Sequence, residues 1–201
     1  MLGELRLEVW FFEFPWNSKR EKYCYDLCTI LEIKPKLFTK ILYLEQQWWY
    51  DHLPNIPPAT SPNQALLENL YSMIVCIYNK IPIMIVGKPG SSKTLAMNII
   101  KTNLSRENKA AGGVFENLPA IEVFSHQCSP LSTSRGIEET FERAIRFQKQ
   151  QKEVLAVVLL DEIGLAEQSP HLPLKVLHRL LEEPEVAVVG LSNWMLDPAK
   201  I

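Results

Sequence analysis

The stretch GKPGSSKT at residues 87–94 limits the possible folds of this chain more than any other feature. It follows directly on the apolar run IPIMIV and precedes a segment that reads as a helix from about Lys93. A small-residue loop between a buried strand and a helix surrounds phosphate groups with backbone N–H groups. In the full pattern, G-x-x-x-x-G-K-[ST], the lysine reaches the β- and γ-phosphates and the hydroxyl binds Mg²⁺. We therefore expect a phosphate-binding loop, with Lys93 and Thr94 in these roles.

The loop departs from this pattern at one position, because Ser92 stands where the second glycine belongs. A serine held there in the left-handed conformation costs about 1–2 kcal/mol. The alternative is a chance Gly/Ser turn before a helix. The expected nucleotide-binding residues are Gly87, Lys88, Pro89, Gly90, Ser91, Ser92, Lys93, Thr94 and Leu95.

An acidic pair follows a second apolar run. VLAVVLL (154–160) predicts a fully buried strand, and Asp161 and Glu162 come directly after it. An aspartate at this point can bind Mg²⁺ together with Thr94, directly or through water. The neighbouring Glu162 can polarise an attacking water and is our candidate catalytic base. The alternative for such a pair is a solvated strand end.

The acidic pair also bears on which base is bound. DEIG (161–164) contains the D-x-x-G of a GTPase, which should be accompanied by an N-K-x-D that reads guanine. The two NK dipeptides, at 79–80 and 108–109, lack that aspartate. We therefore expect ATP, with Mg²⁺, as the ligand.

Two further polar residues follow strands at the same expected edge of the sheet. Asn193 comes after VAVVGL (186–191) and can hold the attacking water or a γ-phosphate oxygen, so it is a second candidate catalytic residue. Its alternative is a turn asparagine. Gln127 can contact Glu162 and gate it, but a surface turn residue is the favoured interpretation.

Short apolar strands alternate with helices along the second part of the chain. The expected strands are 82–86, 120–125, 154–160 and 186–191, and the expected helices are 63–80, one from about residue 93, 132–150 and 173–183. This alternation predicts an α/β fold, a parallel sheet with helices on both faces. Residues 1–52 read as a helical segment and 53–62, with four prolines, as a linker before a nucleotide-binding core at 63–201.

Composition excludes several classes of protein. The formal net charge of −2 and the pI of about 6.1 give no basic surface for nucleic acid. The apolar runs are far shorter than the ~20 residues of a membrane helix, and the N-terminus has no signal-peptide pattern. Four cysteines without a second nearby pair favour reduced thiols in a cytoplasmic protein over a zinc site.

In this order the three motifs resemble those of the AAA+ ATPases, and more closely those of the mysterin family, giant RING-type ubiquitin ligases with a dynein-like AAA+ core. The resemblance covers about 63–201 and is carried by NQALLENLYSMIVC, IPIMIVGKPGSSKTLAM, QCSPLSTSRGI, VVLLDEIGLAEQSPHLPLKVLH and GLSNWMLDPAK. It implies Walker A roles for Lys93 and Thr94, Walker B roles for Asp161 and Glu162, and a sensor 1 role for Asn193.

The resemblance also implies a strand order of 5-1-4-3-2 followed by a helical lid. On that pattern the chain is a fragment truncated after the fourth strand, without the arginine finger, sensor 2, lid or RING. Residues 82–86 are then expected to form an unprotected sheet edge. The isolated chain is expected to bind ATP–Mg²⁺ weakly, to hydrolyse it negligibly and to aggregate.

The expected function is that of a mechanochemical ATPase module in a mysterin-like ubiquitin ligase. Its partners are expected to be neighbouring AAA+ modules of the same large protein and, through domains outside this chain, the ubiquitin machinery. The alternative is a nucleotide-binding scaffold that does not hydrolyse. A small-molecule kinase is disfavoured, because no acceptor-substrate site or lid arginines are apparent.

Overall fold

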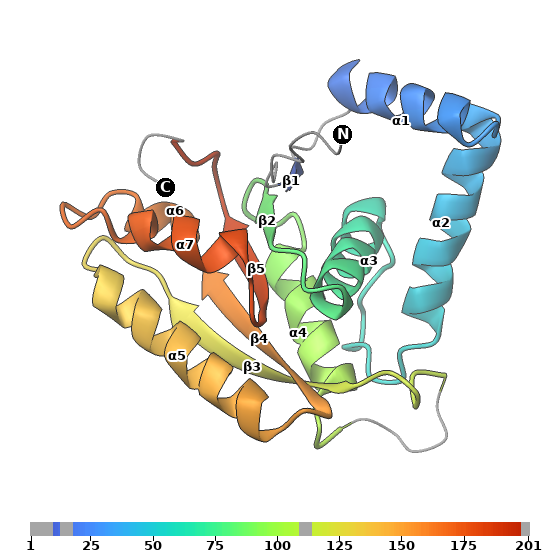
Figure 1. Cartoon of the computed structure of the whole chain (residues 1–201). Coiled ribbons are helices and arrows are strands. Elements are labelled where there is room, and N and C mark those ends of the chain that lie inside the picture. The colour runs from blue at the N-terminus through green and yellow to red at the C-terminus, as the bar shows by residue number, and fades with distance from the viewer. Residues whose placement is uncertain (1–9, 13–17, 109–113, 198–201) are drawn as a thin grey trace, which may run out of the picture.

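The central feature of the molecule is a parallel sheet of five strands in the order β1-β2-β5-β4-β3 (Figure 1). The computed structural model describes residues 10–12, 18–108 and 114–197. Its strands are β1 (Trp10–Phe12), β2 (Ile83–Val86), β3 (Ala120–Gln127), β4 (Val154–Asp161) and β5 (Ala187–Ser192). All four pairs of neighbours run parallel, so the predicted parallel sheet is confirmed.

Helices cover both faces of this sheet, as the α/β prediction requires. Figure 1 shows α3 and α4 against one face and α5 and α7 against the other. The helical elements are α1 (Ser18–Ile30), α2 (Pro35–Asp51), α3 (Gln64–Tyr78), α4 (Lys93–Leu104), α5 (Ser134–Gln150), α6 (Ile163–Ala166), the 3₁₀ helix η1 (Pro173–Val176) and α7 (Leu177–Glu182).

Successive strand residues point into two different cores. In β2, Ile83 and Ile85 pack with α3 and α4, whereas Met84 packs in the second core with α5. In β4, Val157 belongs to the first core and Val158 to the second. Since side chains alternate along a strand, a sheet covered on both faces needs an unbroken apolar run. This explains why IMIV and VLAVVLL carry no polar residue.

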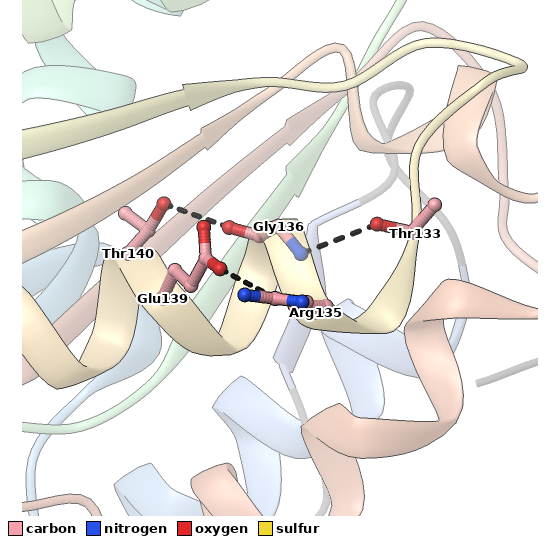
Figure 2. Close-up of polar contacts among 5 residues, drawn as sticks. All are labelled: Thr133, Arg135, Gly136, Glu139 and Thr140. Carbon is pink, nitrogen blue, oxygen red and sulfur yellow. Dashed lines mark hydrogen bonds and ion pairs between the residues drawn. The ribbon is translucent and has the colours of Figure 1, made fainter.

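Local hydrogen bonds define where two of the predicted helices begin. Asn63 caps α3 by accepting from the Leu66 N–H at 2.9 Å. Figure 2 shows the start of α5, where the Thr133 hydroxyl accepts from the Gly136 N–H at 3.3 Å. One turn further on, Arg135 and Glu139 form an exposed ion pair at 2.7 Å and the Thr140 hydroxyl donates to the Gly136 carbonyl. Each cap satisfies an N–H that the first helical turn leaves without a partner.

The sheet edge next to β2 differs from the expectation. Residues 10–12, predicted to be helical, form β1, whose residues Trp10, Phe11 and Phe12 pair with Ile83, Met84 and Ile85. The prediction that 82–86 forms an unprotected edge is therefore wrong. An open edge presents backbone N–H and C=O groups that another extended segment can satisfy. Three residues are too few to show strand periodicity in the sequence.

Smaller differences concern the segment between β4 and β5. The helix predicted at 173–183 begins at Pro173, as expected, but its first turn is the 3₁₀ helix η1 and α7 follows. The four-residue helix α6 was not predicted, because it is too short to show a helical period.

Residues 53–62 contain no helix or strand, as their prolines predicted. They are nevertheless tied to the core, since the buried Asn103 of α4 accepts from the Asn55 N–H at 2.7 Å and donates to its carbonyl at 3.0 Å. Their first residue, Leu53, and Tyr50 shortly before it belong to the core cluster that includes α3. No helix in the described part of the chain combines the length and apolar character of a membrane span.

Candidate nucleotide site

The predicted site residues meet at the carboxyl edge of the sheet. A cavity of about 290 Å³ lies there, lined by Lys93, Thr94, Gln127, Asp161, Glu162, Leu191 and Asn193. Five of these residues lie in or directly after β3, β4 or β5. The other two, Lys93 and Thr94, begin α4, the helix that follows β2 in the sequence. In a parallel α/β sheet the carboxyl ends of the strands are the usual place for a ligand. The fold therefore brings together residues that lie up to 100 positions apart.

Lys93 is directed into the 87–94 loop itself. Its ammonium donates to the carbonyls of Gly87 and Lys88 at 2.5 and 3.1 Å and to the Ser91 hydroxyl at 3.2 Å. The residue is only 7% exposed. Burial lowers the pKa of the Lys93 ammonium, and the nearby Asp161 carboxylate opposes that shift. The loop thus holds a largely buried positive charge among polar atoms at the end of β2.

The loop curls through two residues with positive φ. Gly90 has a φ of 82°, and Ser92 adopts the left-handed conformation with φ 61° and ψ 14°. The strain foreseen for Ser92 is therefore present. Its side chain makes no capping hydrogen bond to α4, so it does not occupy the N–H groups of the first turn. Those N–H groups and the helix dipole favour an anion at this point.

Asn69 supports the loop from a position that the sequence analysis did not identify. This buried residue of α3 donates from Nδ2 to the Ser91 carbonyl at 2.8 Å. The available signal was a polar residue within a helical stretch otherwise rich in buried apolar side chains. The contact makes α3 part of the support for the loop.

The acidic pair lies opposite the loop. Asp161 is the last residue of β4, and its Oδ1 accepts from the Glu162 N–H at 2.9 Å. Glu162 is left-handed with a φ of 52°, which turns the chain sharply after the strand. Gln127, at the end of β3, donates from Nε2 to Glu162 Oε2 at 2.9 Å. The contact between Gln127 and Glu162, which is the less favoured interpretation of Gln127 from the sequence, is therefore present.

The charges of the acidic pair also affect the thiol of Cys128, the residue directly after β3. Burial, followed by the negative charges of Asp161 and Glu162, raises the pKa of its thiol to about 12. The two carboxylates thus create a negative field beside the cavity. A divalent cation would be stabilised by that field.

Asn193 links the last strand to the loop lysine, because its Oδ1 accepts from Lys93 Nζ at 3.2 Å. The residues after it are held against α6. Trp194 donates from its indole Nε1 to Glu167 Oε2 at 3.3 Å, and Glu167 Oε1 accepts the Asp197 N–H. A Cβ on Gly164 would lie 2.8 Å from both Ser192 Oγ and Trp194 Cε2, so only glycine fits beneath the indole. Sequence reasoning missed this contact between segments.

A parallel sheet covered on both faces, with a lysine at a strand–loop–helix turn and two acids at the end of another strand of the sheet, defines the P-loop class of nucleotide-binding α/β domains. The model of the family described as "RNF213 AAA domain" matches residues 59–201. The chain therefore belongs to the RNF213 AAA domain family, and the resemblance drawn from the motifs is confirmed.

Curated relatives agree with this assignment. The chain is 44% identical over 168 residues to the human "E3 ubiquitin-protein ligase RNF213", covering 78% of this chain and 3% of the relative. It is 48% identical over 152 residues to the zebrafish "E3 ubiquitin-protein ligase rnf213-beta", covering 69% of this chain and 3% of the relative. The chain thus corresponds to about 3% of the length of these relatives.

One solved structure, titled "Structure of Rhizobiales Trip13", aligns with 92% of this chain and 62% of its own. The TM-score of 0.36 and the sequence identity of 20% are too low to support an argument. The family assignment therefore depends on the sequence matches.

Proposed function

We propose that this chain binds ATP with Mg²⁺ and hydrolyses it as an AAA+ module of a larger, cytoplasmic ubiquitin ligase. The observation that carries the proposal is the convergence of Lys93, Thr94, Asp161, Glu162 and Asn193 around one cavity. The family assignment supports nucleotide binding in general. Residues 63–201 would form the AAA+ core, with 1–52 as a helical segment before it and 53–62 as the link. The four free cysteines agree with a reducing compartment.

In this proposal the 87–95 segment holds the phosphates. The buried Lys93 ammonium would leave the loop carbonyls of Gly87 and Lys88 for the β- and γ-phosphate oxygens. The free N–H groups at the start of α4 would bind the phosphates together with the loop backbone. Lys93 and Thr94 correspond to the Walker A residues, and Asp161 and Glu162 to the Walker B residues.

The residues present fit a magnesium ion. Thr94 and Asp161 offer a hydroxyl and a carboxylate oxygen in the same cavity, and Mg²⁺ prefers oxygen ligands. Across the described residues, no three His, Cys, Asp or Glu side chains gather to hold a metal by themselves. That agrees with a site in which Mg²⁺ takes most of its ligands from phosphates and water. When bound, the ion would neutralise charge on the phosphates.

Glu162 and Asn193 would act on the water that attacks the γ-phosphate. Glu162 would accept its proton and orient it, and Asn193, as sensor 1, would hold the water or a γ-phosphate oxygen. Hydrolysis would then move the elements that carry these residues relative to neighbouring AAA+ modules. The ubiquitin machinery would be engaged by other parts of the longer protein.

The second candidate function is that of a nucleotide-binding scaffold without turnover. The Gln127–Glu162 hydrogen bond favours it, because a carboxylate held at 2.9 Å by an amide is less free to orient water. Release of that bond would be required before Glu162 acts as a base. The two functions share the binding site and differ only in hydrolysis.

The binding site is tested with Lys93→Ala in the present chain. We expect ATP affinity, measured by isothermal titration calorimetry with Mg²⁺, to fall at least tenfold, about 1.4 kcal/mol. The reason is the loss of the only lysine directed into the loop among the described residues. Lys101→Ala, on the exposed side of α4, is the control. Unchanged affinity in Lys93→Ala would remove the phosphate-loop assignment.

Hydrolysis is tested with Glu162→Gln in the longer protein. The amide keeps the size of the side chain but cannot accept a proton, so we expect ATP to stay bound while phosphate release stops. A Gln127→Ala control should release Glu162 and leave hydrolysis intact or faster. Normal turnover by Glu162→Gln would assign the base to another residue. No turnover in the unmodified protein would support the scaffold function.

A further inference from the structure

Four large apolar side chains are exposed along one side of α2. They are Leu37, Ile41, Leu44 and Trp48, with exposed fractions of 52%, 46%, 52% and 41%. Their spacing of four, three and four residues places them in a single stripe, which we call the α2 stripe. Isolated surface leucines are ordinary, but a continuous apolar stripe on a helix marks an interaction surface.

The α2 stripe lies on the side of α2 away from α3, although the Trp48 ring at its end also packs edge-on against Phe115, with ring centroids 6.0 Å apart. The buried residues of α2 are Gln46 and Tyr50, and Tyr50 belongs to the core cluster shared with α3. At 100° per residue, these two lie on the side of the helix opposite the stripe. Figure 1 shows α3 between α2 and the sheet, with α2 at the outside of the molecule.

The sequence of the stripe identifies its partner. Extended by one position at each end, the stripe reads Lys34, which is the extended N-cap residue directly before α2, then Leu37, Ile41, Leu44, Trp48 and Asp51, at alternating spacings of three and four. Within α2 the residues from Leu37 to Asp51 occupy alternating d and a positions of a heptad. In an antiparallel pair of identical helices, each a position faces a d position of the second copy. Lys34 then faces Asp51, Leu37 faces Trp48 and Ile41 faces Leu44, and symmetry forms each pair twice.

We propose that the α2 stripe is a self-association surface, on which a second copy of this chain docks its own α2 in antiparallel orientation about a two-fold axis. A two-fold interface must be complementary to itself. The stripe meets this condition because its apolar residues face apolar residues of the second copy and its positive end faces a negative end. A parallel pair would place Lys34 against Lys34 and Asp51 against Asp51. Both residues are exposed, so this charge pattern selects the orientation rather than adding much affinity.

The size of the surface predicts a weak dimer. The 17 residues of α2 extend about 25 Å. One pair of helices of this length falls at the low end of interface sizes, where complexes are transient. We therefore expect association in the micromolar range.

The test is sedimentation velocity of the full 201-residue chain between about 1 and about 200 µM. We expect the mass to rise from that of a 23.1 kDa monomer towards twice that value. Ile41→Glu places a charge at the centre of both copies of the stripe and should keep the chain monomeric. Tyr43→Glu is the matched control, because Tyr43 is similarly exposed on α2 but lies off the stripe, and it should still dimerise. Thermal unfolding of both variants confirms that they remain folded.

Charge reversal tests the orientation. Lys34→Asp alone and Asp51→Lys alone should each weaken dimerisation several-fold, since each places like charges opposite one another. The double variant Lys34→Asp/Asp51→Lys should restore it. A chain that stays monomeric throughout the concentration range, or a dimer that survives Ile41→Glu, overturns the proposal. A double variant weaker than both single variants overturns the antiparallel arrangement.

Discussion

Ser92 is a strained residue in the candidate phosphate loop. Its φ of 61° is a conformation that costs a serine about 1–2 kcal/mol, yet the loop depends on it to turn into α4. The side chain gives no cap to the helix, so no local hydrogen bond in the cap offsets the strain. Contacts of neighbouring residues hold the loop instead, above all the Asn69 hydrogen bond to the Ser91 carbonyl.

We predict that Ser92→Gly raises the free energy of unfolding by about 0.5–1 kcal/mol. Relief of the left-handed strain exceeds the extra entropy that glycine adds to the unfolded chain. Urea unfolding followed by tryptophan fluorescence measures the change as a higher midpoint. Ser92→Ala is the control, because it removes the hydroxyl but keeps the strain. A lower midpoint for Ser92→Gly would show that the serine hydroxyl stabilises the loop.

At the scale of elements, the site depends on contacts between segments that follow different strands. Gln127 at the end of β3 donates to Glu162 after β4, and Asn193 after β5 accepts from Lys93 at the start of α4. Trp194 and Glu167 connect the segment after β5 to α6. The strand ends are therefore joined by side-chain hydrogen bonds in addition to the backbone pairing of the strands.

We predict that Glu167→Ala frees the segment that follows Asn193. The variant removes the acceptor of the Trp194 indole N–H, so that proton should exchange with solvent several times faster in NMR spectra. Glu167→Gln should retain slow exchange, because its amide oxygen can accept the same hydrogen bond. An indole proton in Glu167→Ala that stays as protected as in the unmodified chain would show that packing against Gly164 alone holds the tryptophan.

At the scale of the whole molecule, β1 closes the edge of the sheet beside β2. It pairs in parallel with β2, from which it is separated in the sequence by α1, α2 and α3. The aggregation expected from the sequence assumed that this edge was open. With β1 in place, we expect association through the α2 stripe, where four of the large apolar side chains that are exposed in the described residues lie together.

We predict that deletion of residues 1–17, which removes β1, produces large and polydisperse assemblies. The exposed backbone of β2 would pair with strands of other molecules. Deletion of residues 1–9 leaves β1 and is the control, which should form nothing larger than the α2-mediated dimer. Light scattering at equal protein concentration separates these outcomes. A 1–17 deletion that scatters no more than the control would show that β1 does not protect the edge.

The sequence alone determined those features that depend on local pattern. Unbroken apolar runs predicted β2, β4 and β5, because a strand buried on both faces tolerates no polar residue. Asn63 and Pro173 predicted helix starts, because capping and proline geometry act over a few residues. The candidate site residues were also predicted from local motifs, since each motif lies within eight residues or fewer of one strand end.

Only the tertiary structure decided which separate segments meet. Nothing local in WFF at 10–12 indicates that it pairs with β2, because that pairing satisfies backbone groups 73 residues further along the chain. The contacts of Asn69 with the loop, Gln127 with Glu162 and Trp194 with Glu167 likewise depend on how strands are ordered and helices packed. Hydrogen bonds between distant residues carry no periodic signal in the sequence. They form because the sheet brings the carboxyl ends of its strands to one edge.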